Sequence, residues 1–204
     1  MNFFGRNAPA TGGKQEEASA SRRFTLDLAR AENLATMLAH SRASRVVEVA
    51  DLLAGMYLYE WDRLSKYWEG DDQERIEKLL RQICQISPQR WNYWIQYYDK
   101  LRNNGEERAG LLPPLRRKLQ KESAGDPPLK HSAELMSVLK QAEEIAPFHD
   151  TSGARAVPIL TSECVLLCIV RRGGSDISRK LAASGLNVPQ LERDATSSRR
   201  APRS

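Results

Sequence analysis

The chain has 204 residues, of which 41% are hydrophobic and 28% charged, enough for one ordinary globular domain or two small ones. The formal net charge is +5, yet the first 23 residues carry +2 and the last nine carry +3, which leaves residues 24–195 at zero. The basic charge therefore belongs to the two ends and does not indicate a nucleic-acid-binding body. No apolar run approaches the roughly 18 residues that a membrane-spanning helix needs.

The two ends are predicted to be disordered, as an N-terminal arm over residues 1–23 and a basic tail over 196–204. Gly, Ala, Ser and paired charges dominate the arm, which also lacks an apolar stretch of signal-peptide length. Three cysteines without zinc-like CxxC spacing are typical of reduced thiols in a cytoplasm. We therefore expect a cytoplasmic protein without a metal site.

Apolar residues recur at helical spacing in four segments of the first hundred residues. Asp71 or Asp72 supplies a helix start, and Ser87-Pro88 supplies another, with a hydroxyl cap and proline at the first helical position. The predicted helices cover residues 24–40, about 47 to 68 with a continuation or kink near Trp61, about 72 to 83, and 88 to about 102.

The second part of the chain continues the helical pattern. Ser132 begins an amphipathic helix that Pro147 ends, Thr161 caps the most apolar helix, and Gly185 stands where a left-handed C-terminal cap is favoured. No segment shows convincing period-two alternation, so the sequence predicts an all-α protein. The predicted helices here cover residues 115–121, 132–146, 161 to about 172, 176–184 and 189–195.

An internal repeat organises these helices. Residues 31–35 (AENLA) match residues 142–146 (AEEIA) at an offset of 111, and after a loop two residues longer Leu52-Leu53 falls on Val165-Leu166. Each copy consists of an amphipathic helix, a loop and a more apolar helix. We therefore expect a compact helical bundle of two pseudo-repeats that bury their apolar helices against each other.

The second copy carries a recognisable motif. Residues 161–174 (TSECVLLCIVRRGG) resemble the T-E-H-hydrophobic-L-L segment of the Clp repeat, and Gly185-Leu186-Asn187-Val188 followed by Leu191-Glu192-Arg193 is similar to the ending of that repeat. The chain thus resembles the double Clp repeat that forms the N-terminal domain of Clp-type AAA+ unfoldases. The expected organisation is a first repeat over about 24–85, an insertion with an aromatic helix over about 86–130, and a second repeat over about 131–195.

The resemblance implies a domain of residues 24–195 that receives protein clients, adaptors or a partner unfoldase and has no catalytic activity or cofactor. No G-x-x-x-x-G-K-[S/T] motif occurs, so we expect a stand-alone Clp-repeat protein that acts in protein quality control or regulated proteolysis. The alternative is a regulatory protein with a Clp-like sensing bundle and weak nucleic-acid contact through its basic tails. The histidines form no catalytic or metal-binding motif, which argues against an enzyme.

Glu163, beside Ser162, matches the glutamate of the family's T-E-H motif. In the ClpC branch, acidic residues at this motif in both repeats help to bind phosphorylated arginine, whereas the corresponding residue of the first copy is Ala50. The simpler interpretation, which we favour, is that Glu163 stabilises its helix through the macrodipole.

The aromatic helix offers a second candidate contact surface. Trp91, Trp94 and Tyr98 share one helical face, whereas Tyr93 and Tyr97 point elsewhere. We expect Trp91 and Trp94 to be core residues, although Trp94 remains a contact candidate. Tyr93 and Tyr97 are predicted to contact a protein partner, because tyrosine is common at binding hot spots. A second aromatic group flanks the first repeat and allows the same two interpretations: Tyr57, Tyr59, Trp61, Tyr67 and Trp68.

Overall fold

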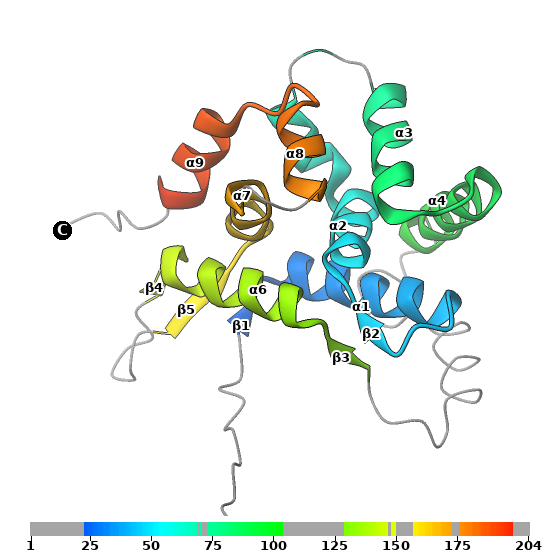
Figure 1. Ribbon diagram of the computed structural model, residues 1–204, viewed down its shortest axis with the longest axis horizontal. Coiled ribbons are helices and arrows are strands. Elements are labelled where there is room, and N and C mark those ends of the chain that lie inside the picture. The colour runs from blue at the N-terminus through cyan, green and yellow to red at the C-terminus, as the bar shows by residue number, and fades with distance from the viewer. Residues whose placement is uncertain are drawn as a thin grey trace, which may run out of the picture.

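A computed structural model describes residues 23–68, 70, 73–103, 129–146, 148–149, 157–172 and 176–197. These residues are mostly helical, as the apolar spacing predicts (Figure 1). The arm before Arg23, the tail after Ser197 and the helix expected over 115–121 lie outside the described residues. The helices are α1 (Leu26–Ser41), α2 (Val49–Leu64), the 3-10 helix η1 (Ser65–Tyr67), α3 (Gln73–Cys84), α4 (Pro88–Asn103), α6 (Ala133–Ile145), α7 (Ser162–Arg171), α8 (Asp176–Ala182) and α9 (Val188–Ser197).

The described part of the chain also contains five short strands, which the sequence did not predict. They are β1 (Arg23–Phe24), β2 (Val46–Val47), β3 (Lys130–His131), β4 (Phe148–His149) and β5 (Val157–Leu160). Four of them have only two residues, so no period-two pattern can develop within them. Each strand pairs with a segment far away in the sequence, except for β4 with β5.

The strands join the two halves of the molecule, residues 23–103 and 129–197, in a reciprocal way. The strand before α1 pairs in parallel with the strand before α7, and Thr25 N–H then donates to the carbonyl of Leu160 at 2.9 Å. The strand before α6 pairs in parallel with the strand before α2, and Ser132 N–H donates to the carbonyl of Val47 at 2.9 Å. Each half therefore supplies one strand to each of the two parallel pairs.

The helix starts follow local chemistry that the sequence makes visible. Thr25, Ser132 and Thr161 each accept a hydrogen bond from a backbone N–H in the first turn of the helix that follows. Helix α4 begins at Pro88, after Ser87, as predicted. Helix α2 has non-helical dihedral angles at Glu60, which confirms a kink in this segment.

The turns before α4 and α9 also resemble each other. Gln85 has φ +52° and Gly185 has φ +83°, so both occupy the left-handed region, and the position of Gly185 is confirmed. Four residues after its N-terminal cap, each helix buries a large apolar side chain completely, Trp91 in α4 and Leu191 in α9. The aromatic helix α4 thus begins in the same way as the last helix of the chain.

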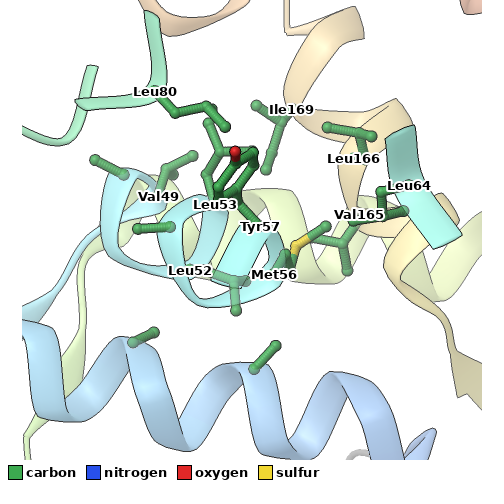
Figure 2. Packing of buried hydrophobic residues seen from close by; sticks show 14 of the residues in the cluster. Val49, Leu52, Leu53, Met56, Tyr57, Leu64, Leu80, Val165, Leu166 and Ile169 are labelled. Atoms are coloured by element: carbon green, nitrogen blue, oxygen red, sulfur yellow. The ribbon is translucent and has the colours of Figure 1, made fainter. Parts of the chain in front are cut away.

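The core is centred on α2 and α7. Figure 2 shows side chains of α2 facing those of α7, with Met56 beside Val165 and with Tyr57 between Leu80 of α3 and Ile169. Helix α1 approaches the opposite side of α2 closely: a Cβ atom at Gly55 would lie 2.2 Å from the carbonyl oxygen of Ala31. Among the residue types, only glycine fits at this close approach, since any Cβ atom would collide with the backbone of α1.

Candidate functional site

A cluster of three carboxyl groups surrounds one arginine where α1, α2 and α7 meet. Glu163 lies in the first turn of α7, and its Oε2 is 3.2 Å from Nη2 of Arg63. The same guanidinium forms an ion pair with Glu60, and its Nη1 is 3.5 Å from Oδ2 of Asp27. We call these four residues the carboxyl cluster.

Glu60 is the buried member of the carboxyl cluster, with 3% of its side chain exposed. The hydroxyl of Ser162, which is fully buried, donates a hydrogen bond to Oε1 of Glu60. Burial raises the pKa of Glu60 to about 7, against the opposing effects of Ser162 and Arg63. Ser162, a predicted binding residue, is therefore buried beneath the carboxyl cluster, where its hydroxyl holds Glu60, and it is not exposed to a partner.

The other side of the carboxyl cluster faces solvent. The side chains of Asp27 and Arg63 are 45% and 38% exposed, whereas that of Glu163 is 14% exposed. When all three carboxyl groups are ionised, they outnumber the single guanidinium and leave an excess of negative charge. The arrangement is suited to a cationic group, which would compete with Arg63 for the carboxylates.

Helix α4 presents a separate aromatic surface. Tyr93 is 51% exposed and stacks on the half-buried Tyr97, with ring centroids 6.2 Å apart. Trp91 and Trp94 are buried, which confirms them as core residues, and Trp91 packs against Tyr57 of α2 at 5.3 Å. The exposed Tyr93 and its stacked neighbour Tyr97 form an aromatic part of α4 that a protein partner could reach.

Part of the second aromatic group borders a cavity of about 560 Å³ beside α2, η1 and α3. Trp61 and Trp68 line it, with ring centroids 5.8 Å apart, and Nε1 of Trp68 donates to Oγ of Ser184 at 2.8 Å. Tyr67 is fully buried, and its hydroxyl donates to Asp194. Among the described residues, the lining consists of Trp61, Ser65, Lys66, Trp68, Gly70, Gln73 and Ile76.

The structure brings the predicted site residues together in two groups. Ser162 and Glu163 belong to the carboxyl cluster, whereas Tyr93, Trp94 and Tyr97 lie on α4. Helix α2 lies between α7 and α4 and contacts both (Figure 1). The two groups therefore form separate surfaces.

The partners of Glu163 were not predictable from the sequence. Arg63 follows Glu60 by three residues, a spacing that favours an ion pair on one helix face, but many surface helices carry such pairs. Nothing in the local sequence indicated that Asp27 would lie near either residue. Their meeting depends on how α1, α2 and α7 pack.

The cysteines are chemically protected. Cys84, Cys164 and Cys168 are all buried and unpaired by disulfides. Burial raises the pKa of Cys84 to about 12 and that of Cys168 to about 11. Because the thiolate is the reactive form, these groups are poor nucleophiles in the folded protein.

Within the described ranges, no three His, Cys, Asp or Glu side chains gather in a way that could hold a metal ion. None of the helices in that part of the chain combines the length and the apolar character needed to cross a membrane. Comparison of the sequence with protein-family models and with curated proteins finds no match.

Proposed function

We propose that the chain is a non-enzymatic protein-interaction domain of the Clp-repeat type, which binds a protein client, an adaptor or a Clp-type unfoldase. Its role would lie in protein quality control or regulated proteolysis. The proposal starts from the motif of residues 161–174 and from the ending that follows it. The observation that carries it further is the reciprocal strand pairing between the two halves.

That pairing supports two pseudo-repeats. It makes Thr25 equivalent to Ser132, since each caps a helix and each donates its N–H to the last strand residue of the other half. It likewise makes Val47 equivalent to Leu160, so Ala50 corresponds to Glu163, as in the sequence match. For the first helix of each repeat, the alignment implied by the strand pairing and the alignment of the sequence match differ by four residues, which is about one helical turn. A shift of one turn leaves the same helix face apolar.

The similar turns before α4 and α9 support a longer first repeat than the sequence indicated. Ser87 and Asn187 occupy equivalent capping positions, and their carbonyl groups accept hydrogen bonds from Trp91 and Leu191 at 2.9 and 3.0 Å. We therefore assign α4 to the first repeat as its last helix, rather than to an insertion. Within the described residues, each repeat would then contain four α-helices, with α3 and α4 corresponding to α8 and α9.

Two surfaces are available for binding under this proposal. Tyr93 and Tyr97 offer stacked aromatic rings on α4, which suit the apolar contacts of a protein partner. The carboxyl cluster offers negative charge, but Arg63 already pairs with Glu163. With Ala50 at the equivalent position of the first repeat, recognition of a phosphorylated arginine would be restricted to one site and would require displacement of Arg63.

Affinity purification with the purified chain as bait tests the proposal. Captured proteins are identified by mass spectrometry, and we expect Clp-type unfoldases, their adaptors or their clients to be enriched. Replacement of Tyr93 by Ala should reduce their capture without unfolding the domain, because that side chain is exposed. Glu192→Gln, an exposed change on α9, is the control and should leave the capture unchanged.

Two results would contradict the proposal. One is the absence of any unfoldase, adaptor or client from the captured proteins, tested with extracts in which these proteins are abundant. The other is a salt-dependent shift of DNA mobility that disappears when residues 196–204 are deleted, which would favour the regulatory alternative.

A further inference from the structure

A second, smaller cavity lies between the end of α1 and the start of α4. Its volume is about 170 Å³. Arginine, serine and glutamine side chains form most of its wall. The described residues that line it are Leu38, Ser41, Arg42, Gln85, Ile86, Ser87 and Arg90.

Two guanidinium groups give the cavity its charge. Nη2 of Arg42 lies 2.6 Å from both carboxylate oxygens of Asp51, so that carboxylate neutralises one of them. Nε of Arg42 is buried without a hydrogen-bond partner. Arg90 is exposed, and its guanidinium donates to the carbonyl oxygen of Ser41. One positive charge therefore remains uncompensated among these three ionised groups.

Neutral donors add to these guanidinium groups. The Ser87 hydroxyl oxygen accepts from the backbone N–H of Arg90 at 3.4 Å, which leaves its own proton free to donate into the cavity. The amide of Gln85 supplies further N–H donors. The N-terminal end of α4 contributes partial positive charge, which favours an anion at the same place.

Gln85, which lines the cavity, adopts a left-handed backbone conformation. Gln85 has φ +52°, a backbone region that is unfavourable for a non-glycine residue, whereas the equivalent turn before α9 places Gly185 there. By the same correspondence, Arg90 in α4 matches Gln190 in α9. The first half thus has a polar side chain at a strained backbone position, and a cation in the following helix. The second half has a glycine and a neutral glutamine at these two positions.

We propose that this cavity binds a phosphate group. Its volume is below the roughly 300–1,000 Å³ of pockets that enclose drug-sized ligands, so the occupant is a small anion or the charged end of a larger molecule. Arg42, Arg90, Gln85 and Ser87 provide donors on several sides, which four phosphate oxygens can satisfy and two carboxylate oxygens cannot. The phosphate is either free or attached to a side chain of a protein partner.

Isothermal titration calorimetry with inorganic phosphate tests this site on the full chain. We expect saturable binding that is at least about tenfold weaker in Arg90→Gln. This variant has the residue that α9 carries at the equivalent position, Gln190. Arg179→Gln removes an exposed arginine on α8 that does not line the cavity, so this control should bind like the unchanged protein. Melting temperatures should be similar for all three proteins, because both arginines are exposed.

Further arms distinguish the possible ligands. Acetate should bind more weakly than phosphate, and a phosphoserine peptide that binds more tightly than inorganic phosphate would identify a partner's side chain as the source. The proposal is overturned if phosphate does not bind, if acetate binds equally well, or if Arg90→Gln has no more effect than Arg179→Gln. None of these outcomes depends on capture of an unfoldase, so the phosphate site and the proposed function can fail separately.

Discussion

Replacement of Glu60 by Gln tests the energetics of the carboxyl cluster. Gln has nearly the same shape as a protonated glutamic acid and can still accept the hydrogen bond from Ser162. It cannot ionise, however, and therefore never places a negative charge in this buried position beside Asp27 and Glu163. We expect Glu60→Gln to stabilise the protein at alkaline pH and to have little effect near pH 4.

The size and sign of the effect follow from the pKa of Glu60. Burial raises this pKa from 4.5 to about 7, a difference of about 2.5 units, and each unit corresponds to 1.36 kcal/mol. Between pH 4.5 and 7 the folded state holds a proton that the unfolded state has released, so the free energy of unfolding falls as the pH rises. Glu60 should therefore lower stability by about 3 kcal/mol at pH 8 relative to pH 4.

Urea denaturation followed by circular dichroism at several pH values from 4.5 to 8 measures this effect. The unchanged protein should lose stability over that range, and Glu60→Gln should lose much less. Glu192→Gln, at an exposed position, should keep the pH dependence of the unchanged protein. If Glu60→Gln is less stable than the unchanged protein at pH 8, its pairing with Arg63 outweighs burial and our reasoning is wrong.

Three further predictions concern packing, backbone strain and thiol chemistry. Gly55→Ala should destabilise the protein by about 2–3 kcal/mol in urea denaturation, because the new methyl group collides with the backbone of Ala31; a gain of about 1 kcal/mol, as helix propensity alone implies, would refute the close approach. Gln85→Gly should raise the melting temperature by relieving the left-handed strain and should weaken phosphate binding; a lower melting temperature would count against strain at this turn. A thiol reagent at pH 8 should modify the cysteines only when urea is present, and rapid modification of the native protein would show that they are accessible.

The helices could be predicted because their signals are local. Ser87-Pro88, Ser132 and Thr161 mark helix starts through side-chain caps that need no distant partner. The strands could not be predicted, because two-residue segments such as β2 carry no periodicity and exist only through pairing with β3. Their pairing depends on the arrangement of the helices.

The candidate site was predictable only in part. Burial of Trp91 and Trp94 and exposure of Tyr93 followed from their positions on one helix. In contrast, the partners of Glu163 come from two other helices, and Arg63 is 100 residues away in the sequence. A single sequence contains no signal for such a contact, which forms only when the apolar helices pack.

The reciprocal strand pairing makes the two halves mutually dependent. A break in the backbone between Asn103 and Leu129 would separate them covalently, yet β1 would still need β5, and β2 would still need β3. Each fragment alone would expose unpaired strand edges together with one side of the α2–α7 contact. The two halves therefore depend on each other as the subunits of an obligate heterodimer do, although one chain contains both. We expect the two fragments to reassemble when they are co-expressed and to aggregate when each is expressed alone.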